Sequence, residues 1–162
     1  MFFSVVIPTY NRLPILEKCL IALENQVISD SFSGYEIIVV DDGSTDGTFE
    51  WIEKNNHILS HVKYIKQKHL GPSVGRNTGV TNSEGDVIVF IDSDLIVKND
   101  FLQQHSRALF NAWKRRKDKK CFTYGSVVNT SNFQYPESEN YKITDISFAY
   151  FATGNVAISR EL

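Results

Sequence analysis

The sequence predicts an α/β domain whose central sheet is mainly parallel. Three short apolar runs have the composition of strands that are buried on both faces, and they cover residues 2–7, 35–40 and 87–91. Amphipathic helical segments lie between these runs, so strands and helices alternate along the chain. With 162 residues, of which 42% are hydrophobic, the chain is long enough for one domain with a substantial core.

The first half of the chain contains two strand–helix units and a further strand. Pro8 ends the first apolar run, and leucines at helical spacing with charged residues between them then predict a helix over residues 13–26. A second helix is expected over 46–56, after the strand at 35–40. A third strand is expected over 62–65.

The second half continues the alternation. Glycines at positions 71, 75 and 79 recur at i, i+4 and i+8, which suggests that one short helix packs closely on its neighbour. Asn99 is expected to cap the next helix. The expected elements are a helix over 74–81, a strand over 87–91, a helix over 100–116, a strand over 121–128, a loop over 129–147 and a last strand over 151–159.

The charge balance and the cysteines limit the classes of partner and location. The chain has 17 basic and 19 acidic residues, so no global field favours nucleic acid. No apolar run approaches the roughly 18 residues of a spanning helix, and the N-terminus lacks the basic start of a signal peptide. Cys19 and Cys121 lack metal-ligand spacing and are expected to be reduced, which favours a cytoplasmic location.

One segment of the chain is strongly basic, although the chain as a whole has nearly equal numbers of basic and acidic residues. Residues 114–120 contain six cations in seven positions, at the expected C-terminal end of a helix. Cations there complement the helix dipole, so a solvated helix end explains the run. The alternative is peripheral contact with an anionic membrane, which would place the protein at the inner face of the membrane.

Polar clusters directly follow three of the predicted strands. They are Thr9-Tyr10-Asn11, Asp41-Asp42 and Asp92-Ser93-Asp94. Right-handed crossovers bring the carboxyl ends of parallel strands to one edge, and ligands bind at that edge in open α/β sheets. We therefore expect the three clusters to contribute to one site.

Two carboxylates end the most apolar strand of the chain. Asp92 and Asp94 can present oxygens to one hard cation, or to a cation and a ribose hydroxyl. A Mg²⁺ or Mn²⁺ ion held in this way keeps several waters and also binds diphosphate oxygens. The alternative is an ordinary strand end with Asp in the turn. The apolar strand before the pair favours the metal site.

Other polar residues offer contacts to a nucleotide. Asp41 or Asp42 can accept a hydrogen bond from a base N–H or a ribose hydroxyl, and Gly43 permits a close backbone approach. Tyr10 could stack on a base, and Arg76 could face a diphosphate. The alternative for Asp41 and Asp42 is a strand–turn–helix join. For Tyr10 it is an aromatic residue packed under the first helix, and for Arg76 it is a position on a solvated helix face.

Four blocks of the sequence together resemble glycosyltransferase family 2. The blocks come in the order and spacing of that family, and the resemblance is strong over residues 3–102 and looser beyond them. The blocks are VVIPTYNR from Val5, EIIVVDDGSTDGT from Glu36, GPSVGRNTG from Gly71 and GDVIVFIDSD from Gly85.

The resemblance implies a GT-A fold, which is a Rossmann-like three-layer α/β/α domain over residues 1–162 with its nucleotide-binding part over about 1–102. It also implies a metal-dependent inverting transfer from a nucleotide-diphospho-sugar, often a UDP-sugar, with Mn²⁺ or Mg²⁺. Carried over by position, the nucleotide-binding residues are Pro8, Thr9, Tyr10, Asp41, Asp42, Arg76, Asp92 and Ser93, the metal ligand is Asp94, and the donor-sugar residues are Gly154 and Asn155.

The chain departs from the family in its acceptor half. In the family, a carboxylate a few dozen residues beyond the segment around Gly154 is the general base that an inverting displacement needs. The sequence ends at Leu162, and Asp145, Glu137 and Glu139 lie too early to match that carboxylate. We therefore expect a domain truncated before its acceptor-side segment, without the general base.

Three hypotheses of function follow from the sequence. The first is an inverting glycosyltransferase of polysaccharide biosynthesis that acts on a glycan, lipid or protein acceptor. The second is a nucleotide-sugar-binding module without catalysis of its own. The third is a nucleotidyltransferase, which would need a glycine-rich basic loop after the first strand, where the chain has Pro8-Thr9-Tyr10-Asn11.

Overall fold

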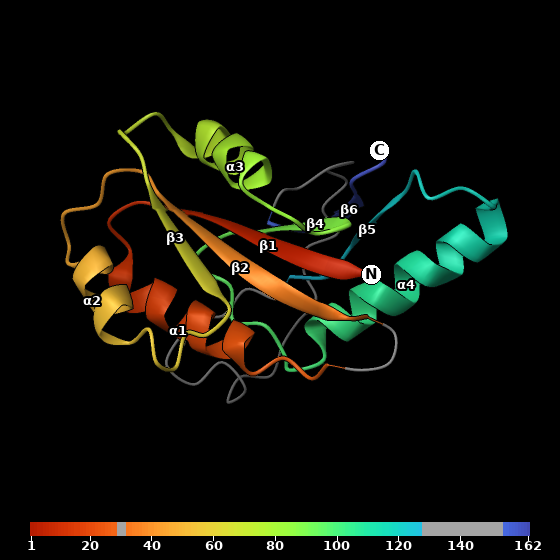
Figure 1. Cartoon of the computed structure of the whole chain (residues 1–162), viewed down its shortest axis with the longest axis horizontal. Coiled ribbons are helices and arrows are strands. Elements are labelled where there is room, and N and C mark those ends of the chain that lie inside the picture. Colours follow the sequence, from red (N-terminus) through yellow and green to blue (C-terminus); the bar gives the residue numbers. More distant parts are fainter. Residues whose placement is uncertain (29–31, 128–153) are drawn as a thin grey trace.

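The central element of the fold is a six-stranded, mainly parallel sheet with the strand order β3-β2-β1-β4-β6-β5 (Figure 1). The computed structural model describes residues 1–28, 32–127 and 154–162. The first four strands in this order are parallel, whereas β6 runs antiparallel to both β4 and β5. The strands are β1 (Phe2–Thr9), β2 (Gly34–Asp41), β3 (Val62–Lys66), β4 (Val87–Ile91), β5 (Phe122–Tyr124) and β6 (Asn155–Ser159).

Helices cover both faces of the sheet and complete the three layers (Figure 1). One face carries α3 alone, and the other carries α1, α2 and α4. This arrangement confirms the predicted three-layer α/β/α fold. The helices are α1 (Leu13–Glu24), α2 (Thr48–Lys54), α3 (Pro72–Thr81) and α4 (Phe101–Arg116).

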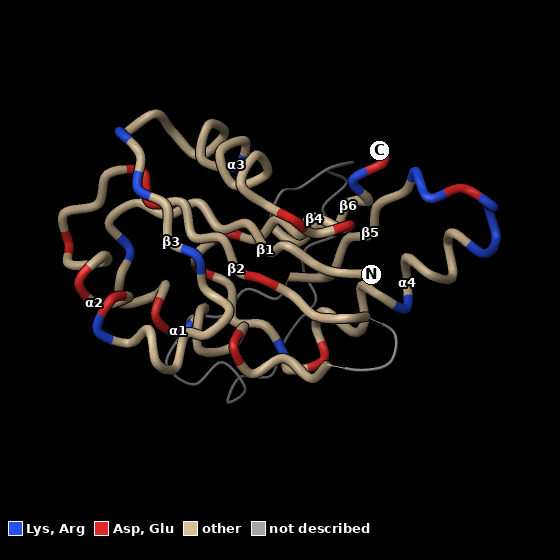
Figure 2. The backbone as a smooth tube through the Cα atoms, viewed as in Figure 1, with Lys and Arg blue, Asp and Glu red and all other residues tan. Residues whose placement is uncertain are grey.

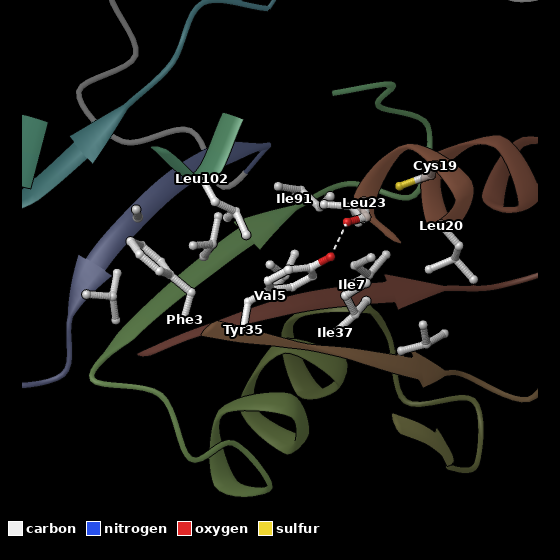
Figure 3. Close-up of a cluster of buried hydrophobic side chains, with 14 of the residues drawn as sticks. Phe3, Val5, Ile7, Cys19, Leu20, Leu23, Tyr35, Ile37, Ile91 and Leu102 are labelled. Carbon is white, nitrogen blue, oxygen red and sulfur yellow. Dashed lines mark hydrogen bonds between the residues drawn. The ribbon is translucent and has the colours of Figure 1, made fainter. Parts of the chain in front are cut away.

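The two faces of β1 pack against different layers, because successive side chains of a strand point to opposite sides. Phe3, Val5 and Ile7 lie in the main core, together with buried residues of α1 and α4 (Figure 3). The same core contains Tyr35, whose hydroxyl donates to the carbonyl oxygen of Leu23 at 3.0 Å. Apolar burial on both faces explains why these strands are apolar throughout.

Close packing of α3 on the sheet depends on its glycines. A Cβ at Gly79 would overlap the Val6 side chain, and a Cβ at Gly75 would lie 3.2 Å from Pro8 Cβ. Both glycines are buried against strands β1 and β2. The close approach suggested by the glycine spacing is therefore present, and it places α3 directly over the ends of these strands.

Some predicted boundaries differ from the structure. The helix predicted from residue 46 begins at Thr48, because Gly47 has a positive φ of 88° and Asp46 remains outside the helix. The last long helix has Asp100 rather than Asn99 as its N-cap residue. The strand predicted over 121–128 is confined to β5. The predicted loop over 129–147, and the first residues of the predicted strand over 151–159, lie outside the described residues.

Both cysteines are free thiols, as expected. Cys19 is buried in the core and Cys121 is half-buried. None of the helices in the described part of the chain combines the length and the apolarity that a membrane crossing requires.

Candidate functional site

The segments that follow β1 and β2 are joined by hydrogen bonds at one edge of the sheet. The backbone N–H of Asp42 donates to the carbonyl oxygen of Thr9 at 2.9 Å. The N–H of Asn11 donates to the Ser44 hydroxyl at 2.9 Å, and Asn11 Oδ1 accepts from the N–H of Thr45 at 2.8 Å. Two of the three predicted polar clusters are thus a single hydrogen-bonded unit.

Asp46 fixes the beginnings of two helices to this unit. Its Oδ2 accepts from the N–H of Leu13, the first residue of α1, at 2.8 Å, and its Oδ1 accepts from the Thr48 hydroxyl at 2.6 Å. Burial raises the pKa of the Asp46 carboxyl, but these hydrogen bonds outweigh burial and lower the pKa below its ordinary value. Asp46 is therefore an anchor of the loop between β2 and α2.

Asp42 is buried, and its carboxylate is surrounded by hydrogen-bond donors. Oδ1 accepts from Gln67 Nε2 at 2.7 Å and from the N–H of Leu70 at 2.8 Å. Oδ2 accepts from the N–H of Gly71 at 2.8 Å and lies 3.0 Å from His69 Nδ1. Burial raises the pKa of Asp42, but these donors together lower it below the ordinary value. Asp42 is thus a carboxylate held in its charged form.

Asp41 is fully buried, and its side chain stabilises the turn that follows β2. Its Oδ1 accepts from the N–H of Ser44 at 2.7 Å, and its Oδ2 accepts from the Tyr64 hydroxyl of β3. Burial, and then the bond to Asp41, raise the pKa of Tyr64. Both Asp41 oxygens therefore have protein partners, which makes this residue a support for the turn that presents Asp42.

The end of β1 brings an aromatic ring next to Asp42. Pro8 and Thr9 are buried, whereas Tyr10 is 43% exposed. The Tyr10 ring lies against the His69 ring, with 4.1 Å between the centroids and 32° between the planes. The hydroxyl of Thr9 is buried without a hydrogen-bond partner in the described part of the chain.

The third predicted cluster lies at the end of β4, where each outer carboxylate pairs with an arginine. Arg76 of α3 donates to Asp92 Oδ1 at 2.7 Å, and Arg12 donates to Asp94 Oδ2 at 2.8 Å. Both aspartate side chains are 45% exposed. Ser93 between them is buried. The two arginines come from two other sequence blocks, so the pairs join three of the four blocks.

The beginning of β6 lies beside the same carboxylates. A Cβ added at Gly154 would lie 3.0 Å from Asp92 Oδ2, so a larger residue would crowd that oxygen. The neighbouring residue Asn155 pairs with Ile91, the last residue of β4. The structure thus brings the segment predicted to contact a donor sugar to the predicted metal site, although more than 60 residues separate them in sequence.

The Asn155 side chain points to a buried histidine that the sequence did not single out. His105 of α4 contacts Asn155 Oδ1 through Nε2 at 3.0 Å and Thr123 Oγ1 through Nδ1 at 2.7 Å. Burial lowers the pKa of His105, and the Asn155 bond opposes this only in part. A neutral imidazole therefore joins α4 to β5 and β6.

A cavity of about 580 Å³ borders this histidine. Its lining is mainly apolar and comes from the segment after Asp94, from α4, from β5 and from the first residue of β6. It includes Leu95, Val97, Phe101, His105, Tyr124 and Asn155. The cavity therefore adjoins the carboxylates at the end of β4 on the side of α4.

Gln67 and His69 are further site residues that the sequence did not indicate. Both lie in the extended segment between β3 and α3, which has neither helical nor strand periodicity. Their role becomes visible only when the fold places this segment beside Asp42. The resemblance to the block that begins at Gly71 starts just after them, and so gives no direct signal for either residue.

Comparison with known proteins defines the class of this fold. The structure resembles that of Staphylococcus aureus TarS residues 1–349 in complex with UDP-GlcNAc, with a TM-score of 0.60 and 31% identity over 70% of this chain and 32% of that chain. A mannosyltransferase from Pyrobaculum calidifontis, in complex with GDP-Man and Mn²⁺, shares the fold at a TM-score of 0.67 and 24% identity, over 98% of this chain. The chain therefore has the GT-A glycosyltransferase fold.

The family follows from the sequence comparison. The family model for glycosyl transferase family 2 matches residues 4–161, and the chain belongs to that family. Glycosyltransferase GlyA of Streptococcus pneumoniae is 35% identical over 100 residues. A cholesterol galactosyltransferase of Borreliella burgdorferi is 29% identical over 160 residues, or 93% of this chain. This chain is therefore a glycosyltransferase domain.

The chain spans only part of each of these relatives. The matched region is 14% of GlyA and 42% of the cholesterol galactosyltransferase. The region matched by the family model, residues 4–161, includes Asp42, Asp92 and Asp94.

Proposed function

We propose that the chain binds a nucleotide-diphospho-sugar with UDP as the nucleotide, and that its sugar is transferred with inversion to an acceptor. The observation that carries this proposal is a pair of unsatisfied polar atoms at the sheet edge. Thr9 Oγ1 and Arg76 Nε are two of the three buried side-chain polar atoms without a hydrogen-bond partner in the described residues. Buried polar groups without partners are costly, and a polar ligand between β1 and α3 would satisfy them.

The nucleobase is assigned to the residues around Asp42. Tyr10 offers an aromatic face for stacking, and the charged Asp42 carboxylate can accept a hydrogen bond from a base N–H. Pro8 and Thr9 form the wall on the β1 side, and Asp41 supports the turn from within. This assignment uses each residue in a role that its burial and contacts allow.

The ribose and the diphosphate are assigned to the carboxylates and arginines at the end of β4. Asp92 is placed near the ribose, and Ser93 lies in the turn between Asp92 and Asp94. Arg12 and Arg76 place positive charge beside Asp92 and Asp94, where an anionic diphosphate would otherwise be repelled. In this arrangement the guanidinium groups orient the phosphates and the carboxylates face the ribose and the metal.

A divalent metal fits the donor set at this position. Asp92 and Asp94 supply hard oxygen ligands on half-exposed side chains. No group of three metal-binding side chains occurs in the described part of the chain, so diphosphate oxygens and water would complete the coordination. Asp94 would hold Mn²⁺ or Mg²⁺, and Asp92 would lie beside it. When bound, the ion stabilises the negative charge of the departing nucleoside diphosphate.

The donor sugar is assigned to the beginning of β6. Gly154 leaves room beside Asp92, and Asn155 is held in place by His105. An inverting displacement also needs a base that takes the acceptor proton, and we assign no described residue to that role. The acceptor is proposed to be a glycan, a lipid or a protein.

Donor binding and turnover test this proposal directly. The chain is titrated with UDP-glucose, UDP-galactose and UDP-N-acetylglucosamine in the presence of Mn²⁺, and release of UDP is followed over time. We expect binding of at least one donor, and loss of that binding in Asp92→Asn. Absence of binding to every donor by folded protein would contradict the proposal. Binding without transfer to any acceptor would favour a nucleotide-sugar-binding module.

We also propose that the basic end of α4 contacts an anionic membrane surface. Figure 2 shows that lysines and arginines gather there, at the opposite end of the long axis from α2. Lys114, Arg115 and Arg116 form the last turn of the helix. Co-sedimentation with vesicles that contain phosphatidylserine should fall when these three residues are changed to glutamine. Equal sedimentation of the wild type with neutral vesicles would contradict the contact.

A further inference from the structure

His69 contacts both groups that the proposed function assigns to the nucleobase. Its ring lies on Tyr10 at a centroid distance of 4.1 Å, and its Nδ1 lies 3.0 Å from Asp42 Oδ2 and 3.2 Å from the Asp42 carbonyl oxygen. Both oxygens can only accept, so Nδ1 is the donor, and its hydrogen bond is to the Asp42 carbonyl oxygen. A nucleobase would present the same two features, namely a flat ring to Tyr10 and an N–H to Asp42.

The Asp42 carboxylate is enclosed by polar neighbours in this structure. It accepts three hydrogen bonds, from Gln67, Leu70 and Gly71, and His69 Nδ1 lies 3.0 Å from its Oδ2, where a fourth donor would approach. A base N–H can therefore reach this carboxylate only if one of these four neighbours moves away. The identity of that neighbour determines how the base reaches Asp42.

Three of the four neighbours, those that donate to the carboxylate, are fixed by other contacts. Leu70 and Gly71 donate from the backbone at the beginning of α3, where Gly71 also accepts from the N–H of Gly75. Gln67 is held at both ends of its amide, because its Oε1 accepts from the Thr78 hydroxyl at 2.8 Å. The His69 side chain, by contrast, is 61% exposed and can rotate into solvent without moving the backbone.

We propose that His69 occupies the nucleobase position in the ligand-free chain and is displaced when the donor nucleotide binds. The proposal rests on the assignment of the base to Tyr10 and Asp42. His69 is then a specificity-determining residue, since a ligand must provide a better ring and a better N–H donor than the imidazole. Groups without a base, such as pyrophosphate, do not compete with it.

Removal of the imidazole should therefore strengthen nucleotide binding. His69→Ala eliminates the competing donor and ring, and affinity should rise by roughly two- to tenfold, which corresponds to the net stability of one hydrogen bond. Lys68→Ala is the matched control, because Lys68 is an exposed neighbour in the same segment. Affinity for pyrophosphate should be equal in wild type, variant and control.

Calorimetric titration of the three proteins with UDP, GDP and pyrophosphate in Mg²⁺ tests the proposal. The expected result is tighter binding of the preferred nucleotide by His69→Ala. Lys68→Ala should bind that nucleotide with the wild-type affinity, and the affinity for pyrophosphate should be the same in all three proteins. Equal or weaker nucleotide binding by His69→Ala would overturn the displacement role and leave the base assignment intact. Failure of all three folded proteins to bind either nucleotide would overturn the proposed function and this inference with it.

Discussion

Arg76 donates a 2.7 Å hydrogen bond to Asp92, and so joins α3 to the carboxyl end of β4. The Arg76 side chain is only 17% exposed, and its Nε has no partner among the described residues. A largely buried guanidinium with a free donor suits the role that we propose for it, which is binding of an anionic diphosphate. In our proposal this pair connects the nucleotide-binding residues to the metal-binding carboxylates.

Substitution of Arg76 should weaken nucleotide binding much more than it weakens the fold. Arg76→Gln removes the charge and the fork of donors, so UDP affinity should fall about tenfold, as for loss of a charged hydrogen bond. Stability should change by less than about 1 kcal/mol, because Asp92 is half exposed. Titration with UDP and denaturant unfolding measure the two effects. Arg107→Gln, on the exposed side of α4, is the control and should alter neither.

The charged state of Asp42 should make stability depend on acid pH. The pKa of Asp42 in the folded chain is below its ordinary value of 3.8, because its donors outweigh burial. The stabilisation is therefore complete above pH 3.8 and is lost as the pH falls through the lower folded pKa. Asp42→Asn should cost about 1.5–3 kcal/mol at pH 7, and this difference from wild type should shrink below about pH 4.

Denaturant unfolding at several pH values measures this linkage. Glu53→Gln on α2 is the matched control, since Glu53 is exposed, and it should track the wild type at every pH. A gap between Asp42→Asn and wild type that stays constant down to pH 3 would show that charge on Asp42 is not what stabilises the loop.

The two α3 glycines should differ in their tolerance of alanine. Gly79→Ala forces a methyl group into buried Val6 and should destabilise the fold by about 1–3 kcal/mol. Gly75→Ala meets Pro8 at 3.2 Å, and the helix propensity of alanine offsets the crowding by about 1 kcal/mol. Denaturant unfolding compares the two variants. Equal stability of both would contradict the contact of α3 with β1.

The two thiols should react at different rates in the folded chain. Burial, and then the charge of Asp94, raise the pKa of Cys19 to about 12, although a backbone hydrogen bond from Leu95 opposes both in part. Cys121 is half-buried. A chromogenic disulfide reagent should therefore modify one thiol quickly in native protein and both after unfolding. Cys121→Ser should remove the fast reaction, and a fast second thiol in the wild type would contradict the buried position of Cys19.

The sequence predicted the fold because its strands are apolar on both faces. Val5 and Val6 are both completely buried, one under α1 and one under α3. The strand therefore lacks the alternation of polar and apolar residues, and its continuous apolar run indicates a parallel sheet. The order of strands and helices then placed Thr9, Asp42 and Asp92 at one edge. Chain order and strand direction therefore determine which residues meet.

The detailed contacts of the site could not be predicted in the same way. The Asp42 carboxylate accepts hydrogen bonds from Gln67, Leu70 and Gly71, and these donors reach it only because the fold places the segment after β3 beside the end of β2. The pairing of Arg12 with Asp94 spans 82 positions and depends on the position of α1. His105 gave no signal of its own in the sequence, because its partners Thr123 and Asn155 come from β5 and β6.

The most direct test of the central claim is calorimetric titration with UDP in the presence and absence of Mn²⁺, on wild-type protein and on Asp94→Asn. If Asp94 is the metal ligand of a nucleotide-sugar site, Mn²⁺ should strengthen UDP binding by the wild type, and Asp94→Asn should abolish that gain while remaining folded. UDP binding that is strengthened equally by Mn²⁺ in both proteins, or no UDP binding by folded wild type, would contradict the assignment.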